Sequence, residues 1–140
     1  MLTPPLPAWP APSPAATSLL VVDDEPEIAE LLAELLQAAG YAVVTAHSGA
    51  QALRLLRLAH FDAIVSDLRM PDIDGAALWR EVVAVEPRLA QRMLFVTGDT
   101  LGAGARGFLA STGCPSLDKP FRRAELLRSV ALLTQDQPND

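Results

Sequence analysis

The sequence is poor in cysteine, histidine and basic residues. Its single cysteine is Cys114, which excludes an internal disulfide and a thiolate metal cluster, so a reducing compartment such as the cytoplasm is expected. Lys and Arg number 11 against 17 Asp and Glu, and the net charge is −6. This balance argues against direct nucleic-acid binding through a broad basic surface. No apolar run approaches the roughly 18 residues that span a bilayer, so no membrane contact is expected.

Proline is unevenly distributed along the chain. Six of the twelve prolines lie among alanines and serines in residues 1–17. Such a composition without hydrophobic periodicity is typical of extended or flexible segments. We therefore expect residues 1–17 to form a Pro/Ala-rich flexible tail or linker, residues 18–133 to form one folded domain, and residues 134–140 to form a frayed C-terminal tail.

Short apolar runs alternate with amphipathic segments throughout the expected domain. The runs predict strands at residues 19–22, 41–46, 63–66, 93–96 and 116–117. The amphipathic segments predict helices at about residues 26–39, 49–59, 75–86, 101–112 and 126–133, with Ser48 and Asp74 as caps, Gly40 as a stop signal and Pro87 just beyond the third helix. Five strands alternating with five helices require parallel pairing through right-handed crossovers. The sequence therefore predicts an α/β fold with a doubly wound, five-stranded parallel sheet.

Polar residues follow four of the predicted strands. Asp23 and Asp24 follow the first strand, Asp67 the third, Thr97 the fourth and Lys119 the fifth. Because the carboxyl ends of parallel strands meet at one edge of the sheet, we expect these side chains to share a rim where such folds bind ligands. Three neighbouring carboxylates favour a bound cation, and oxygen ligands without His or Cys favour Mg²⁺.

Asp67 is the predicted nucleophile at this rim. Taken alone, Asp67 has a simpler interpretation as the residue that begins a turn, and Asp23 or Asp24 singly could be solvated acids. The convergence of acids, a hydroxyl and an ammonium group favours a phosphoryl site instead. Asp67 would attack phosphorus to form an aspartyl phosphate, while Thr97 and Lys119 would supply a hydroxyl donor and a positive charge.

These motifs, taken in order, resemble those of response-regulator receiver domains. The resemblance rests on four separated motifs: Val22-Asp23-Asp24-Glu25, Asp67-Leu68-Arg69-Met70-Pro71 with Asp74-Gly75, Thr97-Gly98, and Lys119-Pro120-Phe121. It covers residues 18–133 and implies the CheY-like, flavodoxin-like (βα)5 fold with strand order 2-1-3-4-5. The runs at residues 97–100 and 118–121 look most like receivers attached to hybrid sensor histidine kinases.

The resemblance also implies roles for individual residues. Asp67 would be the phosphoacceptor, and Thr97 and Lys119 would contact the phosphoryl group. A Mg²⁺ or Mn²⁺ ion would be held by Asp23, Asp24, Asp67 and the backbone carbonyl of Arg69. The Lys119-Pro120 bond is expected to be cis, as is typical of the family.

The resemblance further implies what such a domain would do. A histidine kinase or phosphotransfer protein would donate the phosphoryl group. An output protein or a second copy of the chain would bind the face formed by residues 101–112, 116–117 and 126–133. The domain would catalyse only its own phosphorylation and dephosphorylation, so it is not expected to act as an enzyme on other substrates.

Three residues are expected to tune the switch. Ser116 stands three residues before Lys119, where the family usually has Tyr or Phe, and a serine cannot report activation by burying a ring. We therefore predict an altered relay through the glycine-rich segment 101–112; the alternative is an irregular loop that passes no signal. Arg69 and Asp99 are predicted to form an ion pair over the site that slows hydrolysis, or else to be two solvated charges.

Two other functions remain open at this point. The first is a Mg²⁺-dependent phosphatase that acts on external substrates through an aspartyl phosphate. It would need a second acid or base and a substrate-covering cap, but Arg69 stands where a second Asp is expected and the sequence has no insertion long enough for a cap. The second is a degenerate binding module that never turns phosphate over, and the presence of Asp67, Thr97 and Lys119 argues against it.

Overall fold

Five parallel strands form one sheet in the order β2-β1-β3-β4-β5. The computed structural model describes residues 16–70, 72–98 and 103–135. The strands are β1 (Ser18–Val22), β2 (Ala42–Ala46), β3 (Ala63–Asp67), β4 (Met93–Thr97) and β5 (Ser116–Asp118). The helices are α1 (Pro26–Ala38), α2 (Gly49–Leu58), α3 (Gly75–Val85), α4 (Pro87–Ala90), α5 (Ala103–Thr112) and α6 (Arg123–Gln135). The predicted fold class and strand order are confirmed.

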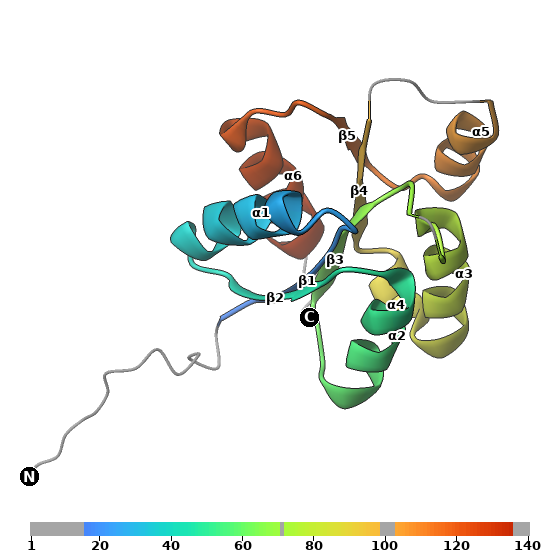
Figure 1. The fold of residues 1–140 in the computed structure, drawn as a ribbon, viewed down its shortest axis with the longest axis horizontal. Helices are drawn as coiled ribbons and strands as arrows, with labels where there is room; N and C mark the ends of the chain where they lie inside the picture. Colours follow the sequence, from blue (N-terminus) through green and yellow to red (C-terminus); the bar gives the residue numbers. More distant parts are fainter. Residues whose placement is uncertain (1–15, 71, 99–102, 136–140) are drawn as a thin grey trace, which may run out of the picture.

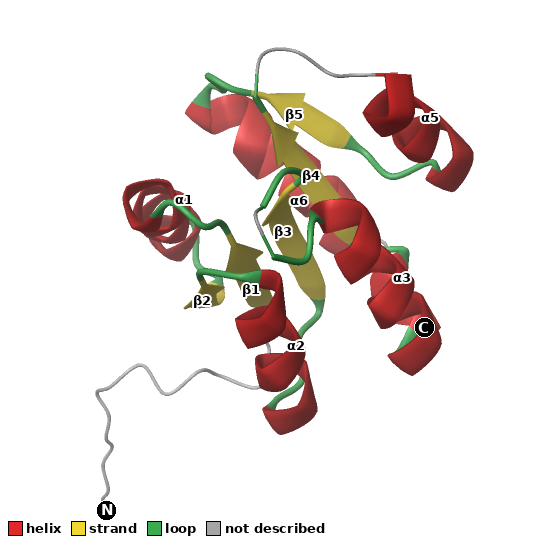
Figure 2. Ribbon diagram, turned by 45° about the vertical axis from the view of Figure 1, so that its right-hand side comes forward, coloured by secondary structure: helices red, strands yellow, loops and turns green. Residues whose placement is uncertain are grey.

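Helices cover both faces of the sheet, with α1 and α6 on one side and α2, α3 and α5 on the other (Figures 1 and 2). Side chains of β1 alternate between the two resulting cores. Leu19 and Val21 pack in the core formed with α1 and α6, whereas Leu20 and Val22 pack in the core with α2 and α3. All four are completely buried. Burial on both faces explains why this strand is continuously apolar rather than alternating.

The predicted helix boundaries are largely confirmed. The Ser48 hydroxyl accepts the N–H of Gln51 at 3.0 Å at the start of α2, and the Asp74 carboxylate accepts the N–H of Ala77 at 2.8 Å at the start of α3. Both side chains satisfy N–H groups that have no partner within the helix. Gly40 follows α1 with a φ of +103°, a conformation that glycine adopts without the steric cost of a Cβ.

Pro87 lies just beyond the end of α3, as predicted. It also begins a short helix, α4, which was not predicted, since the fixed φ of proline suits a first helical position. The structure differs from the prediction at the inner end of both expected tails. Fraying was expected from Thr134, but α6 continues through Gln135. Thr134 is 8% exposed and its hydroxyl donates to the Val130 carbonyl at 2.9 Å. Thr17 was expected in the tail. Its backbone carbonyl accepts the N–H of Ala42 at 2.9 Å and extends the pairing of β1 with β2.

Residues 1–15 and 136–140 of the expected tails lie outside the described residues. Among the helices that the structure describes, none combines the length and the apolar character needed to cross a membrane.

Candidate functional site

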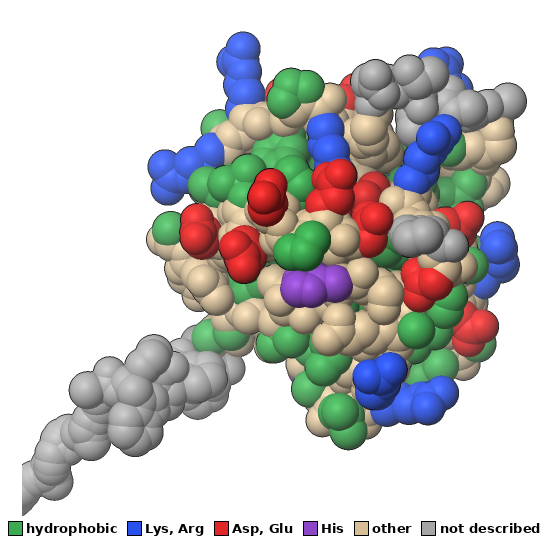
Figure 3. Space-filling view, viewed as in Figure 1, with side chains coloured by type: hydrophobic (Ala, Val, Ile, Leu, Met, Phe, Trp, Pro, Cys, Tyr) green, Lys and Arg blue, Asp and Glu red, His purple; other side chains and the backbone are tan. Residues whose placement is uncertain are grey.

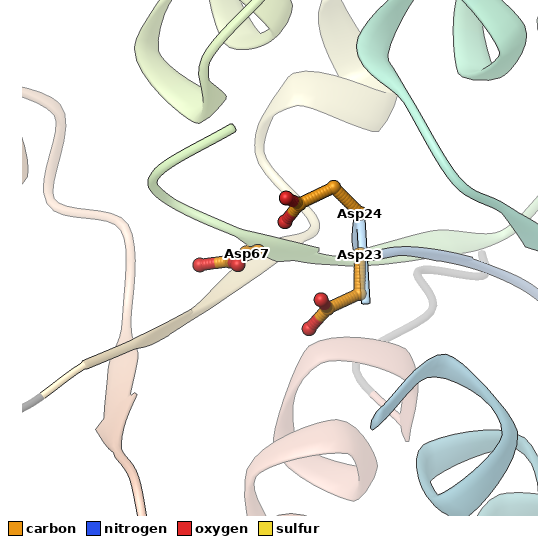
Figure 4. Close-up of side chains that lie close together, drawn as sticks. All are labelled: Asp23, Asp24 and Asp67. Carbon is orange, nitrogen blue, oxygen red and sulfur yellow. The ribbon is translucent and has the colours of Figure 1, made fainter. Parts of the chain in front are cut away.

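Three carboxylates meet at the carboxyl edge of the sheet. Asp23 and Asp24 directly follow β1, and Asp67 is the last residue of β3. One oxygen from each of the three side chains lies within 4.8 Å of the others, with the Asp23 and Asp24 carboxylates turned to the side of Asp67 (Figure 4). On the face shown in Figure 3, acidic side chains gather in the middle with separate basic side chains around them. The structure thus brings together the three acids that the sequence assigned to one rim.

Lys119 brings a positive charge to this cluster from the segment after β5. Its Nζ lies 3.4 Å from Oδ2 of Asp23 and 3.6 Å from Oδ2 of Asp67. Its backbone N–H donates to the Thr97 carbonyl at 2.7 Å, so the end of β5 is tied to the end of β4. The Lys119-Pro120 bond is cis, as the family resemblance implied.

Asp67 is held in an environment that disfavours its ionised form. Burial raises the pKa of Asp67 above its ordinary value of 3.8, and the charges of Asp23 and Asp24 raise it further. The N–H of Arg69, 3.2 Å from Oδ1, and the Lys119 ammonium lower the pKa but do not cancel the rise. The single Lys119 ammonium cannot balance three ionised carboxylates, so the cluster keeps an excess of negative charge.

The donor set fits the hard divalent cation expected from the sequence. Asp23 is fully buried, and its oxygens are already engaged by the N–H of Glu25 at 2.9 Å and by Lys119. Asp24 is half-buried and makes no hydrogen bond with the described residues. An oxygen-rich site with excess negative charge is what Mg²⁺ requires. Asp24 and Asp67 offer the least committed oxygens for such an ion.

The connection between β3 and α3 turns back tightly over the end of the sheet. The N–H of Gly75 donates to the Leu68 carbonyl at 2.9 Å. A Cβ at Gly75 would lie 2.9 Å from both the Asp67 carbonyl oxygen and Phe95 Cε1, so only glycine fits without displacement. The Arg69 peptide is next to Asp67 because its N–H binds Oδ1; its carbonyl as a metal ligand stays a prediction. Pro71 lies outside the described residues.

Asp72 joins this connection to α2, which the sequence did not reveal. Its two oxygens accept the N–H groups of Gly49 at 3.3 Å and Ala50 at 3.1 Å. The N–H of Ile73 has the largest effect on the pKa of Asp72. Together with the two bonds to α2, it holds that pKa below its ordinary value. A Cβ at Gly49 would lie 2.5 Å from the Ile73 Cβ. The β3–α3 connection is therefore in close contact with the start of α2.

Thr97 ends β4 and is almost completely buried, at 2% exposure for the whole residue. Its hydroxyl oxygen lies 3.2 Å from the Gly98 carbonyl oxygen and 3.4 Å from Oδ1 of Asp118. Thr97 is thus at the rim, as expected, but its hydroxyl is already engaged by β5. Arg69 is exposed, and Asp99, its predicted ion-pair partner, lies outside the described residues.

Ser116 begins β5 and is exposed, opposite Phe95 of β4. The glycine-rich segment is helical over the described residues 103–112. Phe108 of this helix makes edge-to-face contacts with Phe95 (5.5 Å between ring centroids) and with Trp79 of α3 (5.7 Å). An aromatic cluster therefore links α5 to β4 and α3. The sequence analysis missed it, although Phe108 is the aromatic residue of this glycine-rich helix.

Comparisons with known proteins agree with this geometry. The family model described as "Response regulator receiver domain" matches residues 19–131. The transcriptional regulatory protein GlrR of Escherichia coli is 36% identical over 115 residues, which cover 80% of this chain and 25% of GlrR. The C4-dicarboxylate transport transcriptional regulatory protein DctD of Rhizobium meliloti is 32% identical over 83% of this chain and 25% of DctD. The chain thus spans about a quarter of the length of these two relatives.

Solved structures show the same similarity. The signal receiver domain of a signal transduction histidine kinase from Syntrophus aciditrophicus superposes with a TM-score of 0.79 at 28% identity, covering 89% of this chain and 95% of that one. The response regulator protein TrrA of Thermotoga maritima, solved in complex with Mg²⁺ and BeF, superposes with a TM-score of 0.72 at 32% identity, covering 84% and 98%. Structural relatives thus include both a kinase-attached receiver and a response regulator.

Proposed function

Because this chain belongs to the response regulator receiver domain family, we propose that Asp67 accepts a phosphoryl group from a histidine kinase or phosphotransfer protein. The observation that carries the proposal is the position of the Lys119 ammonium, 3.6 Å from Asp67 Oδ2, beside two further carboxylates. A positive charge and an acid cluster around one carboxylate suit a group that must carry additional phosphoryl charge.

The proposed transfer is a displacement at phosphorus. An Asp67 oxygen forms the new P–O bond while the P–N bond to the donor histidine breaks, and the electron pair returns to the imidazole nitrogen. Lys119 offsets the charge of the phosphoryl oxygens, and the Thr97 hydroxyl donates a hydrogen bond to one of them. In a separate hydrolysis step water attacks phosphorus, the P–O bond to Asp67 breaks with its electron pair returning to the carboxylate, and inorganic phosphate leaves. The domain thus acts only on its own acyl phosphate.

The proposed cofactor is Mg²⁺, or Mn²⁺ in its place. Asp23, Asp24 and Asp67 would hold the ion together with the Arg69 carbonyl. When bound, the ion would supply positive charge to the phosphoryl oxygens. The solved relative TrrA supports this proposal, since it is in complex with Mg²⁺ and BeF.

The proposed partners are a phosphodonor with a histidine and an output protein or second copy of the chain. The output surface would be the face of α5, β5 and α6, where Arg122, Arg123 and Arg128 are exposed. The net charge of −6 favours a protein partner over nucleic acid. We propose the cytoplasm as the location, since two-component phosphotransfer from a kinase takes place there.

The phosphatase alternative receives no support from the described residues. Arg69 occupies the second position after Asp67, and the β3–α3 connection is bonded closely to the end of β3 and the start of α2. A phosphatase acting on external substrates would need a second acid or base there and a covering cap. A receiver that turns over its own phosphoryl group requires neither.

Incubation with acetyl phosphate and Mg²⁺, followed by intact-mass measurement, tests the proposal. Wild type is expected to gain one phosphoryl group and to lose it over time. Asp67→Asn and a wild-type sample with excess EDTA should gain none. Equal labelling of wild type and Asp67→Asn would overturn the proposal, as would labelling that does not depend on a divalent cation.

A further inference from the structure

The side chains of Thr97 and Asp118 are neighbours across two paired strands. Thr97 of β4 is in register with Asp118 of β5, and the Thr97 hydroxyl oxygen is 3.4 Å from Asp118 Oδ1. The backbones are joined at the same level, because the Lys119 N–H donates to the Thr97 carbonyl at 2.7 Å. Asp118 therefore reaches the buried Thr97 from an exposed position at the edge of the sheet.

The Thr97 hydroxyl has only one proton to donate. In the structure two acceptors share it, the Gly98 carbonyl at 3.2 Å and the Asp118 carboxylate at 3.4 Å. A phosphoryl oxygen on Asp67 would be a third acceptor for the same proton. Binding the phosphoryl group through Thr97 therefore requires that the hydroxyl leave Asp118.

The backbone pairing confines this exchange to the Thr97 side chain. Since Thr97 and Lys119 are bonded through their main chains, the hydroxyl can change partner by rotation about χ1 between staggered positions. Asp118 also carries a negative charge, which disfavours a dianionic phosphoryl group nearby, although its exposure weakens that repulsion. Both effects favour the unphosphorylated state.

We infer that Asp118 is a positioning residue that holds the Thr97 hydroxyl away from the phosphoryl site and so competes with the phosphoryl group for this donor. The inference rests on the proposed phosphorylation of Asp67 and deepens it. Asp118 touches neither the phosphoryl group nor the metal, and it acts through Thr97. The phosphoryl group on Asp67 is therefore stabilised less by the Thr97 hydroxyl than it would be without Asp118.

Binding of beryllofluoride, an unreactive phosphoryl mimic, measures this competition. We expect Asp118→Ala to bind beryllofluoride in the presence of Mg²⁺ about fivefold more tightly than wild type, the worth of one modest hydrogen bond. Asp118→Asn keeps an acceptor oxygen but loses the charge, and it should lie between the two. Glu30→Ala, which removes an exposed carboxylate of α1 that makes no hydrogen bond with the described residues, should bind like wild type.

A double-mutant cycle separates the hydrogen bond from the charge. Thr97→Val removes the hydroxyl and nearly preserves the shape of the side chain. In this background Asp118→Ala should change the affinity by less than about twofold, since the hydroxyl for which Asp118 competes is absent. An equal gain in both backgrounds would mean that Asp118 acts only through its charge, and it would overturn the inference. No gain in either background would overturn it as well.

A metal-free measurement tests the contact itself. In methyl NMR spectra of the protein without Mg²⁺, Asp118→Ala should shift the Thr97 methyl signal toward its position in the beryllofluoride complex of wild type. An unchanged Thr97 signal would contradict the contact. If wild type bound no beryllofluoride at all, the proposed function would fail. If wild type binds and the cycle shows no coupling, the inference alone fails.

Discussion

Lys119 and Asp23 stand 96 positions apart in the sequence and approach to 3.4 Å at the end of the sheet. The Asp23 side chain is fully buried, while that of Lys119 is 23% exposed. A buried carboxylate needs a partner, because burial without one costs several kcal/mol. The ion pair therefore fixes the Lys119 ammonium beside Asp67 before any phosphoryl group arrives.

Removal of the ammonium should destabilise the protein. We expect Lys119→Ala to lower the free energy of unfolding by about 1–3 kcal/mol in metal-free buffer, because Asp23 loses its charged partner. Arg123→Ala, which removes an exposed cation at the start of α6, should change it by less than about 0.5 kcal/mol. Urea unfolding measures both. Equal stability of the two variants would contradict a structural role for the ion pair.

The raised pKa of Asp67 predicts that ionisation of this residue lowers the free energy of unfolding in a pH-dependent way. Because the folded protein holds the Asp67 proton more tightly than the unfolded chain, the folded state binds more protons between pH 3.8 and the higher folded pKa. Its stability therefore falls as the pH rises through this interval, and above it the cost stays constant. Asp67→Asn should stabilise the metal-free protein at pH 7 and have less effect below pH 3.8.

Thermal unfolding of wild type and Asp67→Asn across pH, with EDTA, measures this difference. Excess Mg²⁺ should stabilise wild type more than Asp67→Asn, because ligand binding to the folded state adds stability. A variant that is less stable than wild type at pH 7 without metal would contradict the account.

The contact between α2 and the β3–α3 connection should be sensitive to one methyl group. Gly49→Ala places a Cβ 2.5 Å from the Ile73 Cβ and 2.7 Å from its carbonyl oxygen, and we expect a loss of about 1–3 kcal/mol. Gly104→Ala is the matched control, since its Cβ would meet nothing within 4 Å. Calorimetric titration should also show that Mg²⁺ binds more weakly to Gly49→Ala than to wild type, whereas Gly104→Ala should bind it as wild type does. Unchanged Mg²⁺ affinity of Gly49→Ala would show that this contact does not support the metal site.

The aromatic cluster predicts that a change in α5 is visible at Trp79. If the altered relay runs through α5, beryllofluoride with Mg²⁺ should change Trp79 fluorescence, because Phe108 lies between Trp79 and Phe95. Phe108→Leu should reduce that change. A Trp9→Phe background leaves Trp79 as the single tryptophan.

Amide exchange over residues 103–112 gives a second readout of the same relay. The phosphoryl mimic should alter the protection of these amides in wild type. Equal protection with and without the mimic would end the proposal that α5 carries the signal.

The strand ends were predictable from the sequence because parallel pairing alone sets them at one edge. Polar residues after apolar strands could therefore be assigned to one rim of the sheet without knowledge of packing. These residues are Asp23, Asp67, Thr97 and Lys119. The same reasoning could not find the contacts of Asp72 or Asp118, although Asp118 also follows a predicted strand. Their contacts, with the start of α2 and with the Thr97 hydroxyl, depend on the positions of two elements relative to each other.

The sequence analysis placed Pro87 just beyond α3, which is confirmed, but it missed the helix α4 because proline has two roles at helix ends. Proline ends one helix because it cannot continue it, and it also begins another because its φ suits the first turn. Pro87 does both, since α3 ends at Val85 and α4 begins at Pro87. Thr134 was expected to fray because of its place near the end of the chain, yet its burial comes from packing that periodicity does not report.

Identification of the phosphorylated residue tests the central claim most directly. Borohydride reduces an aspartyl phosphate to homoserine, so reduction of the acetyl phosphate-treated protein followed by peptide mass mapping locates the modified side chain. The account predicts homoserine at position 67 in wild type, in a Mg²⁺-dependent amount. Homoserine at position 23 or 24 instead, or none at any position despite a gain of phosphoryl mass, would contradict it.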